Sequence, residues 1–297
     1  NCVMNDPHSN QCRQNMTHVS YTPEADSIVS ALENAGHRAY YVGGCVRDRL
    51  LGHPSNDVDI ATDARLEEIC RIFPHAQVVG KAFSVAMVHG VEVATFRVDG
   101  PYSDYRHPDY VRIARTIEED VSRRDFTVNA LAQSPDGEII DAFNGREDLE
   151  KRIIRFVGDA DARLQEDPLR ALRACRFAAK IGGRLAPDTR TALEKYHALL
   201  GKVPRERVQG ELTKMLLQYD RKTALNLLQE CSLLPHVLPR LSTSVGVPQE
   251  GYHAEDCWEH AVACVQNVQK KKLSLLLAAL LHDIAKPASR WRDDEGC

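Results

Sequence analysis

The spacing of hydrophobic residues divides the chain into a mixed first part and a helical second part. Up to about residue 157, short strand-like apolar runs alternate with helix-like stretches and with many Gly, Pro, Asn and Asp turns. From residue 161 onward the strand signals fade, and apolar residues recur at helical spacing. We therefore predict an α+β fold, a mixed sheet with helices followed by an all-α part. The predicted helices are residues 24–35, 66–73, 168–181, 189–200, 206–217 and 221–231, and the predicted strands are residues 39–42, 57–60, 78–79, 84–88, 91–97 and 138–141.

The same patterns predict four segments along the chain. Residues 1–20 are polar and are expected to form a disordered tail. Residues 21–157 form the mixed head, and residues 158–243 form a helical neck and body. Residues 244–297 begin a further helical domain after a softer stretch.

Composition narrows the class of protein. The longest apolar run, residues 273–281, is too short to span a bilayer, and the first twenty residues lack the apolar core of a signal peptide. We therefore expect a cytoplasmic protein that does not interact with membranes. The nine cysteines include no C-x-x-C pair, so we expect reduced thiols and neither a disulfide framework nor a zinc knuckle. Because the formal net charge is −4, binding to nucleic acid would require a local concentration of Lys and Arg.

The most informative segment joins a Gly-Gly turn to a pair of aspartates. Gly43 and Gly44 follow an apolar strand, and such a turn lets backbone N–H groups approach a phosphate at a helix N-terminus. Asp57 and Asp59 alternate along a predicted strand, so their carboxylates would share one face, roughly 7 Å apart, where they could hold one or two Mg²⁺ ions. An Asp-x-Asp pair alone also occurs at strand ends and turns. Combined with the Gly-Gly turn, it indicates nucleotidyl transfer.

Two charged groups allow a structural and a functional interpretation. Arg47 and Asp48 could form a helix-surface ion pair, or Arg47 could bind a phosphate with its bidentate fork. Residues 118–130 could form an amphipathic helix capped by Asp125. Alternatively, the Arg-Arg-Asp sequence in this segment, followed by Asn129, could contact a ribose and a triphosphate.

The helix predicted at residues 168–181 carries three arginines at a spacing of three. On a helical wheel that starts at Asp167, the side chains of Arg170, Arg173 and Arg176 form a ribbon opposite an apolar side. A solvated charged face is one explanation. The excess of positive charge also fits phosphates or base edges.

Taken together, these segments resemble class II tRNA nucleotidyltransferases, the CCA-adding enzyme family, which is close to bacterial poly(A) polymerases and has a polymerase-beta-like head. Five motifs carry the resemblance in order: GGCVRDRLLG…DVDIAT, RRDFTVNA, GEIIDAFNGREDL, EDPLRALRACRF and PRERVQGELTKML. The resemblance implies a catalytic head followed by a helical neck and body. It also implies Mg²⁺-dependent transfer of CMP and AMP from CTP and ATP to the tRNA 3′ end, with release of pyrophosphate.

The resemblance further assigns roles to residues of the head. It implies that Asp57 and Asp59 are catalytic and bind Mg²⁺. Gly44, Arg47 and Arg124 would hold the phosphates and the sugar of the nucleotide.

In the helical part, the resemblance implies that Asp167 and Arg170 pair with the edge of the incoming base, and that Arg173 and Arg176 support the triphosphate. Arg207 and Glu211, one helical turn apart, would brace the neck, and an i,i+4 salt bridge is compatible with this role.

Two further features of the head bear on activity. Glu92 could supply a third metal carboxylate. Residues 99–111 resemble the flexible loop of enzymes that add CCA or A, and enzymes that add only CC shorten this loop. The loop is intact here, so CC-only activity is disfavoured.

His260 and the pair His282-Asp283 resemble the start of an HD metal-phosphohydrolase domain, although histidines on apolar helices are usually core residues. A complete HD site needs a further aspartate, and Asp293 and Asp294 are too near in sequence to serve. We therefore expect an incomplete metal site in a truncated domain.

Several alternatives to a CCA-adding enzyme remain. Within the same class they are an A-adding enzyme and a poly(A) polymerase. From other classes they are a non-catalytic RNA-binding protein, which the intact Asp pair disfavours, and an HD phosphohydrolase, which the missing aspartate disfavours.

Overall fold

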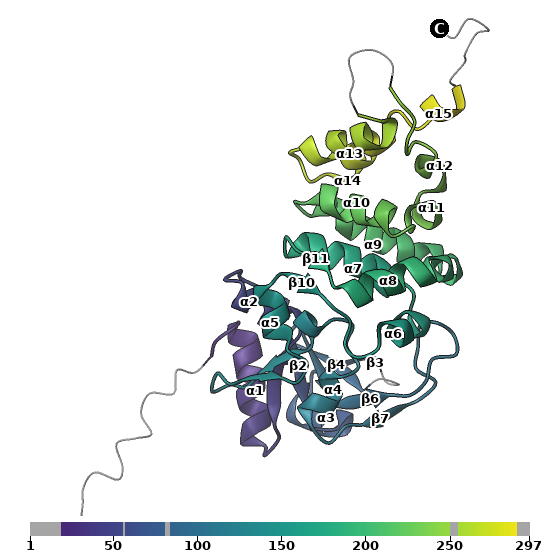
Figure 1. The fold of residues 1–297 in the computed structure, drawn as a ribbon. Helices are drawn as coiled ribbons and strands as arrows, with labels where there is room; N and C mark the ends of the chain where they lie inside the picture. The colour runs from purple at the N-terminus through teal and green to yellow at the C-terminus, as the bar shows by residue number, and fades with distance from the viewer. Residues whose placement is uncertain (1–18, 56, 81–83, 250–254, 290–297) are drawn as a thin grey trace, which may run out of the picture. The chain divides into compact units, whose positions relative to one another are not determined.

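The structure, a computed structural model, describes residues 19–55, 57–80, 84–249 and 255–289 (Figure 1). Contacts between residues divide the chain into two compact units. The predicted disordered tail, residues 1–20, lies outside the described residues except for Val19 and Ser20. The first unit comprises the chain up to Gly100, Tyr110–Arg124 and Val128–Gly145, and the second comprises Pro101–Asp109, Asp125–Thr127 and the chain from Arg146 onward.

A seven-stranded mixed sheet forms the centre of the first unit. Its strands are β1 (Ala39–Val42), β2 (Asp59–Thr62), β3 (Gln77–Gly80), β4 (Val85–Val88), β5 (Val91–Thr95), β8 (Leu131–Gln133) and β9 (Ile139–Asp141). Their order across the sheet is β3-β4-β5-β2-β1-β8-β9. Strands β2 and β5 run parallel, and the other neighbours run antiparallel.

Helices of the first unit pack their apolar stripes on this sheet. Thr22 caps the first helix by accepting a hydrogen bond from the backbone N–H of Ala25 at 3.2 Å, and the helix buries Ile28 and Leu32 in a core that also contains Tyr41. This unit therefore has its own hydrophobic core. Its helices are α1 (Pro23–Asn34), α2 (Gly44–Leu50), α3 (Leu66–Ile72) and α4 (Ile117–Val121), and β6 (Arg97–Asp99) and β7 (Val111–Ile113) form a separate hairpin.

Two features of the strands differ from the sequence prediction. The strand expected at residues 91–97 is divided into β5 and β6, because the backbone of Phe96 bonds to Thr62 and Ala114 instead of continuing one ladder. Strands β7 and β8 were not predicted, and neither were two short strands at Ile153–Ile154 and Arg184–Leu185. All three residues of β8 are buried, so it lacks the alternation of polar and apolar residues that marks a half-exposed strand.

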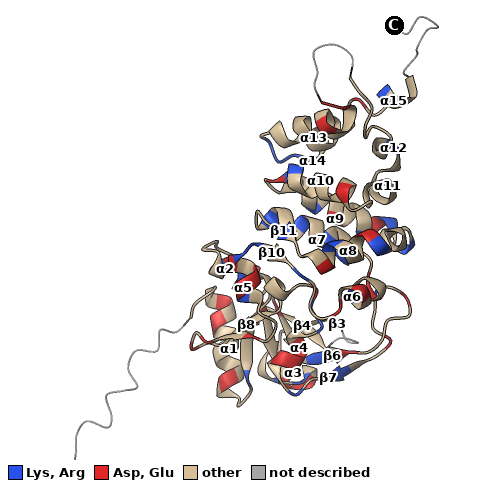
Figure 2. Cartoon of the chain, viewed as in Figure 1, with Lys and Arg blue, Asp and Glu red and all other residues tan. Residues whose placement is uncertain are grey.

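The second unit is almost entirely helical. Within it, α7, α10, α13 and α14 pack in succession, α7 on α10, α10 on α13 and α13 on α14, and α14 carries no charged side chain (Figures 1 and 2). No described helix is long and apolar enough to cross a membrane. Its elements are α6 (Ala160–Glu166), α7 (Arg170–Lys180), α8 (Pro187–Tyr196), η3 (His197–Lys202), α9 (Arg205–Leu217), α10 (Arg221–Glu230), α11 (Leu234–Val237), α12 (Pro239–Ser242), α13 (Cys257–Asn267), α14 (Leu273–Leu281) and α15 (Lys286–Ser289), together with α5 (Gly145–Glu150) at the unit boundary and a parallel pair of short strands, β10 (Ile153–Ile154) and β11 (Arg184–Leu185).

The α+β prediction is confirmed, and the long helices lie within a few residues of their predicted positions. The largest difference is at residues 189–200. There α8 begins earlier, at Pro187, and ends at Tyr196, where a 3₁₀ helix takes over.

Candidate active site

A tight turn at Gly43 opens the candidate site in the first unit. Gly43 has a φ of +78°, which favours glycine, and its N–H donates to the carbonyl of Leu131 at 2.9 Å. A Cβ at this position would clash with Nη1 of Arg124. Glycine at position 43 therefore permits both the turn and the close approach of the Arg124 guanidinium. Gly44, the next residue, is the first residue of α2.

Asp59 is the first residue of β2, and Asp57 is an exposed residue that precedes the strand. The predicted strand over residues 57–60 therefore starts two residues too early, because β2 begins at Asp59 and Asp57 lies outside it. The reason lies in the neighbouring strand. Val42, the last residue of β1, pairs with Asp59, and the chain then turns at Gly43, so β1 offers Asp57 no partner.

Three carboxylates influence one another at this end of β2. Asp59 is paired with Glu92 in the parallel register of β2 and β5. The pKa of Asp59 is raised to about 6, first by burial and then by the charge of Glu92, with a smaller effect of Asp57, whereas Arg124 acts in the opposite direction. Concentrated negative charge of this kind is relieved by a divalent cation with oxygen ligands. The possible third carboxylate noted in the sequence, Glu92, is thus placed beside Asp59.

Arg47 lies inside the first unit with only 2% of its surface exposed. Its Nε and Nη2 donate to Asp48 at 2.8 and 2.7 Å, and its Nη1 donates to Oδ1 of Asn129. The ion pair with Asp48 exists, but the interpretation that it lies on the helix surface is wrong. A direct contact of Arg47 with a phosphate would require the guanidinium to leave these partners.

The segment that contains the Arg-Arg-Asp sequence does not continue as an amphipathic helix. Thr127–Asn129 form one 3₁₀ turn, and β8 follows. Residues 126–130 are all buried, so a helix with a solvated face does not fit there. Phe126 stacks on Phe156, with 5.1 Å between ring centroids. The interpretation of Asp125 as a helix N-cap is therefore wrong.

In the second unit, Asp167 does not belong to α7. It caps the C-terminal end of α6 with an extended backbone (φ −148°, ψ 99°), and α7 begins at Arg170. The helical wheel that placed Asp167 in register with the arginines is therefore wrong at its first position. Asp167 precedes Pro168, and a residue before proline avoids the α conformation. Its carboxylate instead accepts hydrogen bonds from both Nη atoms of Arg207, at 2.8 and 3.2 Å.

Arg170 is held by groups from several segments of the second unit. Its Nη1 donates to the carbonyl of Arg163 at 3.1 Å and pairs with Glu166, and its guanidinium lies 6.0 Å from the ring centroid of Tyr102. Tyr102 belongs to residues 99–111, the segment that resembles the flexible loop of enzymes that add CCA or A. The position of Arg170, which is 8% exposed, is thus strongly constrained.

Arg173 and Arg176 both pair with carboxylates of the second unit. Nε and Nη2 of Arg173 donate to Oδ2 of Asp125 at 2.8 and 2.5 Å, and Nε of Arg176 donates to Glu211 at 2.6 Å. Glu211 is almost fully buried. The expected i,i+4 bracing on α9 therefore takes another form, since Arg207 and Glu211 each pair with a different element.

The histidines that were likened to an HD domain also lie together in the second unit. His260 is on α13, and Nε2 of His282 lies 3.0 Å from Oδ2 of Asp283. Sequence reasoning missed Cys264, although its spacing of four from His260 places both side chains on one face of a helix. The candidate downstream aspartates lie outside the described residues.

Two known protein families match parts of the chain. Residues 39–155 match the Poly A polymerase head domain, and residues 184–244 match the Probable RNA and SrmB-binding site of polymerase A. The first match contains the Gly-Gly turn and the three carboxylates. The second extends from β11 to the residues that follow α12.

Several proteins resemble the chain over most of its length. It is 47% identical over 223 residues to the CCA-adding enzyme of Geobacillus thermodenitrificans, a region that covers 74% of this chain and 55% of that enzyme. The chain thus spans just over half the length of this relative. Its fold is similar to the crystal structure of the Bacillus stearothermophilus CCA-adding enzyme in complex with CTP (TM-score 0.65, 34% identity, 90% of this chain and 71% of that one). It is also similar to a tRNA nucleotidyltransferase complexed with a primer tRNA and an incoming ATP analog (TM-score 0.64, 26% identity, 86% of this chain and 75% of that one).

Proposed function

Because the chain belongs to the CCA-adding enzyme family of tRNA nucleotidyltransferases, we propose that it adds CMP and AMP from CTP and ATP to the 3′ end of tRNA and releases pyrophosphate. The observation that carries this proposal is the cluster of three carboxylates, those of Asp57, Asp59 and Glu92, which lies near Arg124. CTP, an ATP analog and a primer tRNA are named in complexes of similar proteins and support the same substrate class.

Mg²⁺ is the cofactor that these carboxylates fit best, and we assign it to Asp57 and Asp59 with Glu92 beside them. The raised pKa of Asp59 reports crowded negative charge, and carboxylate oxygens are the ligands that Mg²⁺ prefers. When bound, Mg²⁺ stabilises negative charge on the attacking and leaving oxygens of nucleotidyl transfer. The protein contributes the parallel pairing of β2 with β5, which holds Asp59 and Glu92 in register before any ligand binds.

The nucleotide phosphates are assigned to Gly44 and Arg124. The turn at Gly43 leaves room for the Arg124 guanidinium next to the start of α2, and a guanidinium suits bidentate binding of phosphate oxygens. Arg47 is the third residue of this group. Since its guanidinium is bound to Asp48 and Asn129, it serves the phosphate site most directly by fixing the start of α2 to the segment before β8.

The base of the incoming nucleotide is assigned to Asp167 and Arg170. A carboxylate acceptor and a guanidinium donor can complement the hydrogen-bonding edge of either C or A. Arg207 orients the Asp167 carboxylate, and Glu166 orients Arg170, so both groups are positioned in advance.

Arg173 and Arg176 are assigned to the support of the triphosphate, as the sequence resemblance implied. In this structure each guanidinium is already engaged, Arg173 by Asp125 and Arg176 by Glu211. They would therefore act on the nucleotide mainly by holding Asp125 and the helical scaffold in place.

The proposed division of labour follows the segments predicted from the sequence. We assign catalysis to the predicted head, residues 21–157, contacts with the nucleotide base and the RNA to residues 158–243, and an HD-like helical segment to residues 244–297. A tRNA substrate is consistent with a cytoplasmic location.

The nucleotide that is added can be tested with three tRNAs that end at the discriminator base, at C and at CC. Each is incubated with Mg²⁺ and with radiolabelled CTP or ATP alone. The proposal predicts addition of C to the first two tRNAs and of A to the third. Addition of A only to the third tRNA would identify an A-adding enzyme, and repeated addition of A to unrelated RNA would identify a poly(A) polymerase. No addition to any tRNA would contradict the proposal.

A further inference from the structure

Arg123 is the arginine of the Arg-Arg-Asp sequence that has no role in the proposed nucleotide site. Its Nε and Nη2 both donate to Oδ1 of Asp120, each at 3.1 Å. Asp120 belongs to α4, and Arg123 lies on the turn that follows this helix. The side chain of Asp120 is 1% exposed and that of Arg123 is 18% exposed. Arg123 is therefore bound to a buried carboxylate of the first unit.

The carboxylate of Asp120 connects three segments of the first unit. Besides the guanidinium of Arg123, its Oδ1 accepts a hydrogen bond from the backbone N–H of Arg97, the first residue of β6, at 3.0 Å. One oxygen atom thus ties α4 to the start of β6 and to the turn that follows α4. The other oxygen, Oδ2, is buried and has no hydrogen-bond partner among the described residues. Because a buried carboxylate is destabilising unless it is paired, Asp120 depends on the guanidinium of Arg123.

Arg124, the proposed phosphate ligand, directly follows Arg123 on this turn. Its backbone N–H donates to the carbonyl of Val121 at 3.1 Å, so the turn is closed against the end of α4. Its guanidinium reaches Gly43, where it leaves no room for a Cβ. Since this guanidinium lies at the end of a long side chain, a small shift of the turn would displace it, and a misplacement of about 1 Å can lower a rate about a hundredfold.

We propose that Asp120 is a positioning residue of the phosphate site, which acts on the nucleotide through Arg124. By holding Arg123 and the backbone of Arg97, it fixes the turn from which the Arg124 side chain extends. Neither Asp120 nor Arg123 touches the nucleotide in this arrangement. Direct binding of a phosphate by Arg123 would leave the buried carboxylate without its partner, which is costly. The inference rests on the proposed nucleotide transfer, because it takes Arg124 as a ligand of the phosphates.

Calorimetric titration of the 297-residue protein with CTP and with ATP, in the presence of Mg²⁺ and without tRNA, tests this role. D120A removes the acceptor, so we expect the Kd to rise about tenfold, by the same factor for CTP and ATP because both carry the phosphates. D120N keeps an acceptor oxygen but loses the charge, and we expect a rise of about threefold. E118Q changes an exposed carboxylate of the same helix and is the matched control, which should bind both nucleotides as the wild type does.

A double-mutant cycle separates the positioning of Arg124 from a general loosening of the fold. R124A removes the proposed phosphate ligand and weakens nucleotide binding by itself. If Asp120 acts only through this residue, D120A and D120N cause no further loss in the R124A background, whereas independent effects would add. D120N retains the shape of the aspartate side chain, so the cycle can be completed even where D120A does not fold. An additional loss in R124A as large as in the wild-type background would overturn the proposal.

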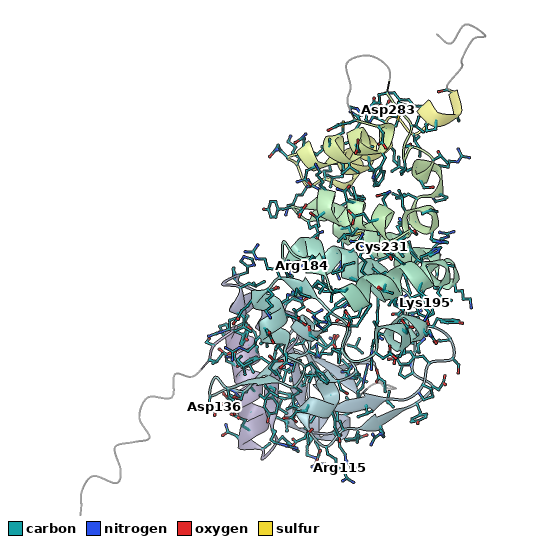
Figure 3. The ribbon with its side chains drawn as sticks, viewed as in Figure 1. Arg115, Asp136, Arg184, Lys195, Cys231 and Asp283 are labelled. Carbon is teal, nitrogen blue, oxygen red and sulfur yellow. The ribbon has the colours of Figure 1, made fainter. Side chains whose placement is uncertain are left out.

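Replacement of Arg123 supplies a second cycle. R123A should weaken the binding of both nucleotides in the wild-type background and have no effect in R124A. R115A is its matched control, since Arg115 is exposed just before α4, at the outer edge of the first unit (Figure 3). A further loss caused by R123A in the R124A background would show that Arg123 contacts the nucleotide directly, against the proposal.

The result for the wild type distinguishes this inference from the proposed function. Failure of the wild type to bind CTP or ATP would contradict the proposed function and, with it, the positioning role. Normal binding by the wild type, together with unchanged affinities of D120A and D120N, would contradict the positioning role of Asp120 alone.

Discussion

Asp59 and Glu92 are partners across the parallel strands β2 and β5, and each carries a carboxylate. After burial, the charge of Glu92 is the largest cause of the raised pKa of Asp59, about 6 against an ordinary value of 3.8. This arrangement is costly without a cation, and its cost can be measured.

The first prediction concerns the titration of Asp59 in the metal-free protein. Replacement of Glu92 by Gln removes one negative charge, so we expect the pKa of Asp59 to fall from about 6 toward 3.8. Carboxyl-carbon NMR measures this shift when the pH is varied from about 3 to 8, a range that includes both pKa values. E67Q, an exposed change on α3, is the control.

The sign of the associated stability effect follows from the same values. The folded state holds the Asp59 proton more tightly than the unfolded chain does. Protonation of Asp59 therefore stabilises the folded state. This stabilisation is fully present below about pH 4 and is lost as the pH rises through about 6. E92Q should lose less stability across this interval than the wild type. Equal losses, or an unchanged titration midpoint, would show that Glu92 does not act on Asp59.

The second prediction concerns the choice between CTP and ATP. R170A removes the guanidinium that we propose as donor to the base edge and that Glu166 and Tyr102 contact. Since a good hydrogen-bonding contact to a base contributes about 1–3 kcal/mol of discrimination, we expect the ratio of kcat/KM for the two nucleotides to change by about tenfold or more. R190A removes an arginine from an exposed ion pair and serves as the control. An equal loss of activity with both nucleotides would argue against recognition of the base by Arg170.

The third prediction concerns the stability of the second unit. Glu211 is buried and pairs with Arg176, whose side chain is 12% exposed, so E211A leaves a largely buried guanidinium without its main partner. We expect the free energy of unfolding in urea to fall by about 3–5 kcal/mol. E194A, which breaks the exposed pair with Arg190, should cost less than about 1 kcal/mol.

The pH dependence of this pair gives an independent check. Burial tends to raise the pKa of Glu211, but the guanidiniums of Arg176 and Arg173 outweigh it and hold the pKa below the ordinary value of 4.5. The stability that the pair contributes is therefore present above about pH 4.5 and is lost on further acidification. The difference between wild type and E211A should narrow as the pH falls through this range, and a constant difference would contradict the assignment.

Local sequence patterns predicted most of the fold and drew attention to the turn and the carboxylates of the proposed site. The helices of the second unit have long apolar stripes, and the Gly-Gly turn and the Asp-x-Asp pair lie within twenty residues of each other. Strand β8 escaped prediction because it is buried on both faces. The helical wheel around Asp167 failed because Pro168 sets the start of α7.

The partners of the charged site residues could not be predicted, because they are distant in the sequence. Arg47 meets Asn129 across 82 residues, Arg173 meets Asp125 across 48, and Asp167 meets Arg207 across 40. Periodicity within one element carries no information on such pairs. The sequence therefore showed which residues are chemically able to act, while the fold determines which of them are already paired.

The central claim is that Asp59, with its neighbouring carboxylates, is essential for nucleotide addition. The most direct test compares single-turnover addition of labelled CTP to tRNA by the wild type, D59A and D63A. Asp63 follows the other end of β2 and pairs with Arg38 at 2.8 Å, so D63A is a matched control. We expect D59A to lower the rate on the order of a thousandfold, since it removes several kcal/mol of charge stabilisation, with tRNA binding and the rate of D63A nearly unchanged. Addition by D59A at the wild-type rate would contradict the account.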